Sequence, residues 1–320
     1  MTPLFTIAIP AYKSLYLKEC IESVLAQSYK HFEVVIVDDA SPDNLYDIVC
    51  QFNDNRIRFY RNEVNCGAIN VVDNWNICLG YSKGDYIICM GDDDKLLPNC
   101  LEKYVKLIDA YPNRHIYHAR TQIINERSEF YQIQEPRPIE ESVYSMIWNR
   151  WHGRLQYIGD FLFEVSTLRA NGGFYKLPLA WASDDISTFI AAKEGGIVNS
   201  QIPLFQYRVN SNNISSTSNA EIKLKAIKQE REWYNVFLQV QPSDETDAVY
   251  RKMILNDIDK HFKKKQLLTI KDDIVKRSIS RYFYWLFRRK RFGLSFADMA
   301  YLLINVFQRK YTIKKHKGCY

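Results

Sequence analysis

The sequence predicts an α/β fold with a mostly parallel sheet flanked by helices, followed by a C-terminal helical extension. In the first hundred residues, short β-rich runs alternate with segments whose apolar residues recur at intervals of three and four. This alternation is typical of βαβ units, in which helices cover a parallel sheet. After residues 210–219 the pattern is helical throughout. We therefore expect a sheet domain over residues 1–215 and a basic, mainly helical region over residues 216–320.

Local patterns place the individual elements. The expected strands cover residues 5–9, 32–37, 57–60, 85–90, 197–198 and 204–207. The expected helices are one that Ser14 can cap, with apolar positions between Leu17 and Leu25, one near residues 67–82 and one over residues 183–192. After the second strand, Ser41 and Pro42 are residue types that favour the cap and the first position of a helix. We therefore expect a further helix to begin at Pro42.

Polar residues follow three of these strands at the point where each ends. They are Pro10–Tyr12, Asp38–Asp39 and Asp92–Asp94. In open α/β sheets the ligand binds beyond the carboxyl ends of the strands, so these residues are expected to converge on one crevice.

The acidic run Asp92–Asp94 comes directly after a wholly apolar strand. Adjacent carboxylates repel one another, and a divalent cation with oxygen ligands would relieve the repulsion. A solvated turn that caps the next helix would have the same residue types. The motif alone leaves both interpretations open, and its position at the predicted crevice favours the cation.

In order and spacing, these segments resemble the inverting glycosyltransferases of family 2, which have the GT-A fold. The matching segments lie between residues 4 and 100 and are Ile7–Tyr12, Ile21–Tyr29, Phe32–Ser41, Asn65–Gly67, Gly84–Ile87 and Gly91–Asp94. The resemblance implies a Rossmann-like GT-A domain, a nucleotide-sugar donor and Mn²⁺ or Mg²⁺ as cofactor.

The resemblance also implies which residues bind the nucleotide. Asp39 matches the aspartate that accepts a hydrogen bond from the imide N–H of uracil, and Pro10 and Tyr12 match the turn beside the base. Asn65 belongs to the matching Asn-x-Gly segment. Capping of the helix expected at Pro42 is the alternative role for Asp39.

Cleavage of a sugar–diphosphate bond leaves an additional negative charge on the nucleotide, which a metal ion can neutralise. The resemblance places Asp92 near ribose and phosphate, with Asp93 as the metal ligand and Asp94 close by. Arg208 is a candidate contact of the pyrophosphate. Two residues later, Asn210 stands where many family members carry His, and Asn is a poor metal ligand.

A one-step inverting transfer needs a base that removes the proton of the acceptor hydroxyl. Asp184 and Asp185 resemble the Glu-Asp pair of the family, which implies Asp185 as the base and Asp184 as its neighbour. The alternative is structural, because Ser183 followed by two aspartates also favours a helix N-terminus. Residues 120–180, where the resemblance fades, are expected to shape the acceptor site.

The charge of the chain is unevenly distributed. Residues 261–320 contain 16 Lys and Arg against 3 Asp, a net charge of +13, so the rest of the chain carries −7 within the total of +6. Within residues 281–310, aromatic residues are interleaved with basic ones, as in segments that lie on anionic membranes. A helical subdomain with a basic outer face is the alternative. Nucleic acid is a less favoured partner.

No apolar run is long enough to span a bilayer, and no leader is evident at residue 1, so we expect a cytoplasmic protein. If the basic region binds lipid, the protein lies at the inner face of the membrane. The leading hypothesis is a metal-dependent enzyme that moves a sugar to a glycan or lipid-linked acceptor in surface polysaccharide biosynthesis. A nucleotidyltransferase is one alternative, although the first strand is not followed by a glycine-rich phosphate loop. A non-catalytic nucleotide or nucleic-acid binder is the other.

Overall fold

We analysed a computed structural model that describes residues 2–210 and 219–317. The chain forms two compact units, one of Met1–Thr217 with Gln241–Ile254 and one of Ser218–Val240 with Leu255–Tyr320. The first unit holds the sheet, and the described part of the second is helical.

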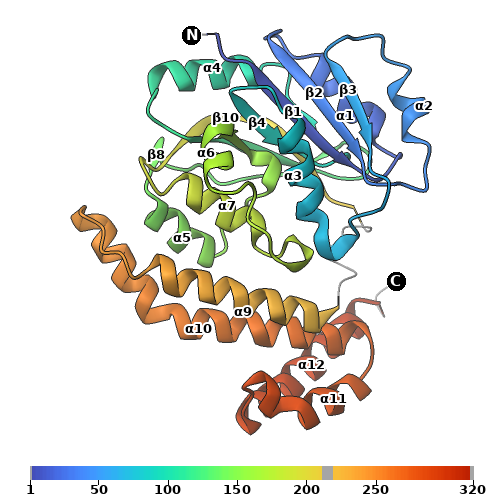
Figure 1. Ribbon diagram of the computed structural model, residues 1–320. Helices are drawn as coiled ribbons and strands as arrows, with labels where there is room; N and C mark the ends of the chain where they lie inside the picture. Colours follow the sequence, from blue (N-terminus) through green and yellow to red (C-terminus); the bar gives the residue numbers. More distant parts are fainter. Residues whose placement is uncertain (1, 211–218, 318–320) are drawn as a thin grey trace. The chain divides into compact units, whose positions relative to one another are not determined.

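The sheet of the first unit has the strand order β3-β2-β1-β4-β9-β6-β10-β5, with β7 and β8 pairing beside β6 and β10 (Figure 1). The strands are β1 (Phe5–Ala11), β2 (Phe32–Asp38), β3 (Ile57–Arg61), β4 (Tyr86–Cys89), β5 (Lys95–Leu96), β6 (Ile116–Ile124), β7 (Phe130–Ile133), β8 (Glu140–Glu141), β9 (Phe161–Glu164) and β10 (Ile197–Arg208). Pairing directions give β3, β2, β1, β4, β6 and β10 one common direction. Their carboxyl ends therefore lie at the same edge.

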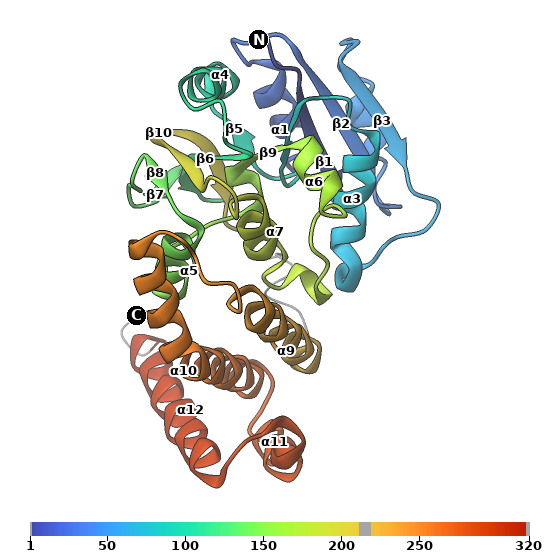
Figure 2. The same ribbon diagram turned by 60° about the vertical axis from the view of Figure 1, so that its left-hand side comes forward.

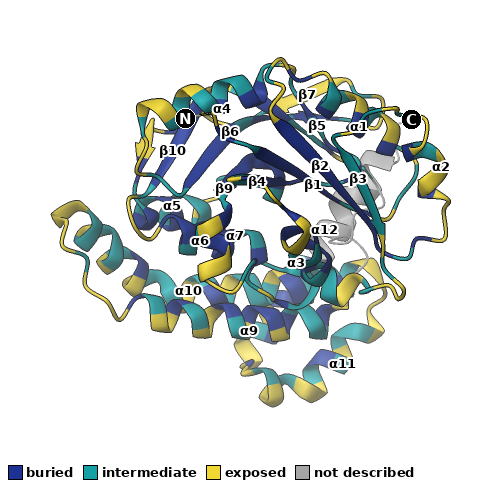
Figure 3. Cartoon of the chain, turned by 45° about the horizontal axis from the view of Figure 1, so that its top comes forward, coloured by how far each residue is buried: buried dark blue, intermediate teal, exposed yellow. Residues whose placement is uncertain are grey.

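Helices cover both faces of this sheet (Figure 2). They are α1 (Leu17–Leu25), α2 (Leu45–Val49), α3 (Val71–Tyr81), α4 (Cys100–Ala110), α5 (Val143–Trp151), α6 (Val165–Ala170) and α7 (Ser183–Ala191), with 3-10 turns η1 (Ala68–Asn70), η2 (Ile158–Asp160) and η3 (Pro178–Ala180). Alternate residues of β1, such as Ile7 and Ile9, share one buried core with α1, α2 and α4. Helix α3 packs against β1, β2 and β4. Figure 3 shows the central strands as almost wholly buried, as expected for a covered parallel sheet.

The predicted fold class is confirmed, and three local predictions are wrong. The N-cap of α1 is Tyr16 rather than Ser14. Helix α2 begins at Leu45 rather than at Pro42. The Ser41 hydroxyl does not cap it, because this hydroxyl accepts from the backbone N–H of Asp43 (3.0 Å) and donates to the carbonyl of Tyr12 (2.6 Å). The two late strands expected at 197–198 and 204–207 are a single strand, β10.

The second unit is built from α9 (Ala220–Phe237), most of α10 (Glu245–Lys276), α11 (Ser280–Arg288), the 3-10 turn η4 (Arg289–Phe292) and α12 (Phe296–Lys317). Its core includes Tyr234, Ile274 and Trp285, each almost completely buried. Asp273 is also buried and accepts from Trp285 Nε1 (2.9 Å) and Arg281 Nε (2.8 Å), so its charge is neutralised. Among the described helices of the whole chain, none combines the length and apolar character needed to cross a membrane.

Candidate active site

The residues predicted to form a crevice do meet at the carboxyl edge of the sheet. The carboxylate of Asp92, after β4, accepts from the backbone N–H groups of Tyr12 and Lys13 after β1, both at 2.7 Å. At the end of β10, the backbone N–H of Arg208 donates to Asp94 Oδ1 at 2.9 Å. The backbone N–H groups and carboxylates therefore connect the ends of β1, β4 and β10.

Asp39 is buried directly after β2, and described residues donate hydrogen bonds to its carboxylate. Its Oδ1 accepts from Asn62 Nδ2 (2.8 Å) and from the backbone N–H of Cys66 (2.9 Å). Its backbone carbonyl accepts from Asn65 Nδ2 (2.6 Å). Burial, and then a hydrogen bond to the Asp39 carboxylate, raise the pKa of the Cys66 thiol to about 11. Uracil recognition by Asp39, and the part of Asn65 in it, stay predictions.

The neighbouring Asp38 has a structural role that the sequence did not separate from that of Asp39. Its Oδ1 accepts from the backbone N–H of Ser41 (2.7 Å), and its Oδ2 pairs with Arg61. These contacts fix the turn after β2. The two aspartates therefore have different roles, because Asp38 stabilises the turn and Asp39 contacts the loop that contains Asn65.

Asp92 holds the turn after β1, which the sequence predicted to lie beside the base. Burial raises the pKa of Asp92 to about 6, although the backbone N–H groups of Lys13 and Tyr12 counteract this. Tyr12 itself is exposed and Pro10 is partly buried, so the surface of this turn is open to a ligand. The predicted contact of Asp92 with ribose and phosphate is not tested by these bonds.

The carboxylates of Asp93 and Asp94 converge beside Gly91. A Cβ atom on Gly91 would lie 2.9 Å from Asp93 Oδ1 and 3.0 Å from Asp94 Oδ2. Burial, and then the charge of Asp93, raise the pKa of Asp94 well above its ordinary value. Two converging carboxylates that repel each other fit a divalent cation, whose other ligands would come from the nucleotide and water.

Within residues 2–210 and 219–317, no group of three or more His, Cys, Asp or Glu is placed to hold a metal ion. Mg²⁺ in nucleotide sites is commonly held by one or two carboxylates together with phosphate oxygens, so two protein ligands are sufficient. Asp93 and Asp94 remain the predicted ligands.

The guanidinium of Arg208, predicted to contact pyrophosphate, is fully buried. Its Nε donates to the backbone carbonyl of Asp93 (2.8 Å) and its Nη1 to Ser128 Oγ (2.9 Å). Its Nη2 donates to Glu19 Oε2 (3.1 Å), and Tyr16 stacks on it with the ring centroid 4.0 Å from Cζ. A phosphate would have to replace some of these partners. The observed role of Arg208 is to tie the Asp93 turn to the loop after β6.

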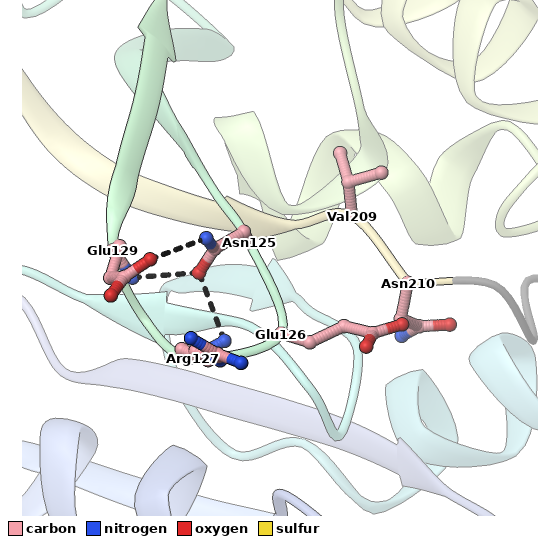
Figure 4. Close-up of a pocket in the computed structure, with 6 residues that line it drawn as sticks. All are labelled: Asn125, Glu126, Arg127, Glu129, Val209 and Asn210. Carbon is pink, nitrogen blue, oxygen red and sulfur yellow. Dashed lines mark hydrogen bonds between the residues drawn. The ribbon is translucent and has the colours of Figure 1, made fainter. Parts of the chain in front are cut away.

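Asn210 directly contacts the predicted metal ligand, because its Nδ2 donates to Asp93 Oδ2 at 2.5 Å. It also lines an open pocket of about 450 Å³ at the ends of β6 and β10 (Figure 4). The lining residues are Asn125, Glu126, Arg127, Glu129, Val209 and Asn210. This loop after β6 gave no signal in the sequence, yet it borders the Asp93 turn.

Asp185 is buried in the first turn of α7, and its Oδ1 receives two hydrogen bonds. Arg150 Nε on α5 donates at 2.8 Å, and Gln156 Nε2 donates at 2.7 Å. Both partners lie in the stretch where the sequence pattern fades, so neither was predicted. Asp184 beside it is partly buried, and its backbone carbonyl accepts from Thr188 Oγ1 (2.7 Å).

Residues 156 and 157 link the two sets of carboxylates. Gln156 contacts Asp185, and the ring of Tyr157 stacks on Tyr207 with centroids 3.6 Å apart. Tyr207 directly precedes Arg208, whose N–H donates to Asp94. The turn that carries the metal-ligand candidates and the start of α7, which carries the base candidate, are therefore connected through residues 156 and 157.

Backbone strain is concentrated around this site. A positive φ in a non-glycine residue costs about 1–3 kcal/mol and is common where function fixes the backbone. Among the described residues, the non-glycine residues with positive φ are Ala40, Ser128, Leu179, Ala180 and Ala182. Ala40 follows Asp39, Ser128 contacts Arg208, and Ala182 is two residues before Asp184. The strain therefore coincides with the loops that carry the candidate residues.

Comparison with protein families identifies the class of this site. Residues 6–166 match the family model described as Glycosyl transferase family 2. The chain is 27% identical over 171 residues to an uncharacterized glycosyltransferase of Rickettsia typhi, which covers 51% of this chain and 52% of that protein. It is 35% identical over 105 residues to the glycosyltransferase GlyG of Streptococcus pneumoniae, which covers 32% and 34%. The chain thus spans about half the length of these relatives, or less.

Two solved structures have a similar fold. One is that of Staphylococcus aureus TarS 1–349 in complex with UDP-GlcNAc, with a TM-score of 0.62, 16% identity, and coverage of 90% of this chain and 88% of that chain. The other is that of the mannosyltransferase PcManGT from Pyrobaculum calidifontis in complex with GDP-Man and Mn²⁺, with a TM-score of 0.55, 14% identity, and coverage of 99% and 88%. At these identities the likeness shows the fold alone, and the expected GT-A fold is confirmed.

Proposed function

The chain belongs to glycosyl transferase family 2, and on that premise we propose that it is a metal-dependent inverting glycosyltransferase. It moves a sugar from a nucleotide diphosphate to a hydroxyl group of its acceptor. The main support for the proposal is the series of contacts that connects the turn of Asp93 and Asp94 to Asp185 through residues 156–157. A donor site with a cation and a base on the acceptor side are the two requirements of such a transfer.

The donor in this proposal is a UDP-sugar. A nucleotide sugar is supported by the likeness to structures solved with UDP-GlcNAc and with GDP-Man. Uracil is supported by the position of Asp39, which matches the base-binding aspartate of the family and is held at the end of β2 by Asn62 and Cys66. Guanine also has a ring N–H beside a carbonyl that a carboxylate can accept, so the nucleotide must be tested directly.

In the proposed mechanism, Asp93 and Asp94 hold Mn²⁺ or Mg²⁺. The bound cation neutralises the charge that develops on the departing diphosphate. Asn210 keeps one carboxylate oxygen of Asp93 fixed, and Arg208 holds the backbone of the same turn. These contacts maintain the two carboxylates in their converging arrangement before the donor binds.

Asp185 acts as the base, with Asp184 beside it. Arg150 and Gln156 both bind Oδ1, which orients the carboxylate and leaves Oδ2 to accept the proton of the acceptor hydroxyl. As that proton moves to Oδ2, the hydroxyl oxygen bonds to the anomeric carbon on the face opposite the diphosphate. The bond from this carbon to the diphosphate oxygen breaks, and the nucleoside diphosphate leaves with the bonding electrons. Attack from the opposite face inverts the anomeric configuration.

The test compares nucleotide sugars with and without Mn²⁺ or Mg²⁺ by thermal shift, and then measures sugar hydrolysis or transfer. Ligands that bind only the native state raise its stability by an amount that increases with the logarithm of ligand concentration above Kd. Asp93→Ala is expected to lose metal-dependent turnover. Asp185→Asn is expected to keep nucleotide binding and lose transfer, whereas Asp109→Asn, which changes an exposed carboxylate on α4, is the matched control.

Normal transfer by Asp185→Asn would show that the base is wrongly assigned. Failure of every nucleotide sugar to raise the melting temperature, with or without metal, would argue against the donor site itself. Retention of metal dependence in both Asp93→Ala and Asp94→Ala would exclude these residues as metal ligands.

The acceptor in this proposal is a glycan or a lipid-linked glycan, as in surface polysaccharide biosynthesis. A lipid-linked acceptor requires the protein to work at a membrane surface. The basic helical unit is the part of the chain suited to that location.

A further inference from the structure

Helix α11 exposes an apolar stripe that no described residue covers. Ile279, Phe283 and Phe287 recur every four residues and therefore lie along one side of the helix. They are 40%, 53% and 81% exposed, respectively. Figure 3 likewise marks much of α11 as exposed or partly exposed. Large aromatic side chains with this exposure in a short helix indicate an interaction surface.

The stripe is not needed for the packing of α11, because another residue already anchors the helix. Trp285 is completely buried, and its Nε1 donates to the buried carboxylate of Asp273 at 2.9 Å. Its ring lies 5.1 Å from that of Phe292 in the following turn. Phe283 and Phe287 are thus left facing away from the core of the unit.

The end of this stripe is strongly cationic. Phe287 is followed by four consecutive basic residues, of which Arg288, Lys290 and Arg291 are exposed. We call the six residues Ile279, Phe283, Phe287, Arg288, Lys290 and Arg291 the α11 surface. The remaining basic residue of the run, Arg289, stacks on Phe296 with its Cζ 3.8 Å from the ring centroid.

Nearby acidic residues do not cancel this charge. Asp273 is buried and paired with Arg281 and Arg277. Asp298 pairs with Lys263 at 2.6 Å and also accepts from the backbone N–H of Ser295. Between residues 274 and 317 the chain has 12 Lys and Arg but only this one acidic residue, so the outward field is positive.

We propose that the α11 surface binds the headgroup region of an anionic lipid bilayer. Phe283, Phe287 and Ile279 enter the boundary between headgroups and acyl chains, while the three cations contact lipid phosphates. A symmetric contact with the α11 surface of a second copy of the chain would bring the same positive charge against it. Nucleic acid would match the charge, but Ile279 offers a base no aromatic ring on which to stack. The proposal does not depend on sugar transfer.

The test uses the full chain and vesicle flotation, with phosphatidylcholine alone or mixed with phosphatidylglycerol. The protein is expected to float only with the anionic vesicles and to be released by salt. Because each surface cation contributes about fivefold to binding, the triple variant Arg288→Ser/Lys290→Ser/Arg291→Ser should lower vesicle affinity about a hundredfold. Its matched control removes three exposed lysines elsewhere in the unit and is Lys225→Ser/Lys228→Ser/Lys260→Ser.

The apolar part is tested separately with Phe283→Ser/Phe287→Ser, which leaves every charge in place. Loss of two inserted aromatic side chains should lower vesicle affinity by at least about a hundredfold. Val236→Ser/Val240→Ser removes exposed apolar residues from the α9 segment as the control. All variants are checked for unchanged melting temperature, and because each set changes only exposed residues, either one suffices if the other fails to fold.

Three results would overturn the proposal. The first is equal binding to neutral and anionic vesicles, and the second is unchanged binding of both α11 variants. The third is binding to a labelled single-stranded oligonucleotide, lost in the α11 variants, without any binding to vesicles. Vesicle binding with no sugar transfer would leave this inference standing and count only against the proposed enzyme.

Discussion

Replacement of Asp160 by Asn is expected to stabilise the protein at neutral pH. Asp160 is the last residue of η2, which directly follows residues 156 and 157, and it is completely buried. It accepts from Thr121 Oγ1 (2.5 Å), Gln134 Nε2 (2.7 Å) and the backbone N–H of Tyr157 (2.9 Å). Asn can keep these contacts, because its carbonyl oxygen accepts from Gln134 and Tyr157 while its amide donates to the hydroxyl of Thr121.

The magnitude follows from proton linkage. Burial raises the pKa of Asp160 to about 6, against an ordinary value of 3.8, although Thr121 and Arg137 partly counteract the shift. The folded state therefore holds this proton more tightly than the unfolded chain. The stability contributed by the protonated carboxyl is fully present below pH 3.8 and is lost as the pH rises through about 6. A shift of about two units corresponds to about 3 kcal/mol.

The assay is urea unfolding of the wild type and of Asp160→Asn at a series of pH values. The variant lacks this titration, so its stability relative to the wild type should increase by about 3 kcal/mol between about pH 4 and pH 8. The slope of this difference is the critical quantity, because a constant offset would reflect only altered packing. A difference that is independent of pH would refute the assignment of a raised pKa to Asp160.

Three further substitutions test how the site is held. Gly91→Ala introduces a Cβ within 3.0 Å of carboxylate oxygens of both Asp93 and Asp94. Metal-dependent nucleotide affinity should therefore fall at least about tenfold, with little change in melting temperature. Unchanged affinity in isothermal titration would contradict the cation site. Arg208→Gln removes a buried charge with several partners, so the free energy of unfolding measured in urea should fall by about 3–5 kcal/mol. Unchanged stability with weakened nucleotide binding would instead favour a direct contact between Arg208 and phosphate. Arg150→Gln should lower the turnover rate about tenfold to a hundredfold while leaving nucleotide affinity unchanged. Arg150→Lys should recover part of that rate. Equal losses of affinity and rate would contradict an orienting role for Arg150.

Much of the fold and the outline of the donor site could be predicted from the sequence, because both depend on local patterns. Alternation of apolar runs and helical periodicity placed β1, β2 and β4, and parallel pairing then brought their polar ends together. The failed prediction of a helix at Pro42 has a local cause. The side chains of Asp38 and Ser41 bond the turn in a non-helical form, and this competition between side-chain and helical hydrogen bonds is not visible in residue types alone.

The partners of the candidate residues could not be predicted, because they come from distant parts of the chain. Arg150 and Gln156 reach Asp185 across 35 and 29 residues. Arg208 reaches Asp93 across 115 residues, and its complete burial is unusual for an arginine whose type suggested a phosphate contact. Such contacts depend on how helices and loops pack on the sheet, whereas the sequence pattern reports only which face of each element is buried.

The effect of Asp92 on stability can be measured separately from its effect on ligand binding. Like Asp160, it is buried, with a pKa raised to about 6, so its charge destabilises the folded protein at neutral pH. Asn at this position can still accept from the backbone N–H groups of Tyr12 and Lys13 through its carbonyl oxygen. Asp92→Asn should therefore raise the melting temperature at neutral pH, as Asp160→Asn does.

The two variants should differ in ligand binding. Asp92 bonds the turn predicted to contact the base and directly precedes the cation candidates, whereas Asp160 bonds Thr121, Gln134 and Tyr157. Asp92→Asn is expected to weaken binding of the nucleotide sugar with Mn²⁺ by about tenfold or more, while Asp160→Asn leaves it unchanged. Calorimetric titration of both variants at one pH makes the comparison. Equal affinities would mean that the charge of Asp92 does not contribute to ligand binding, and the destabilisation caused by its burial would then lack a functional reason.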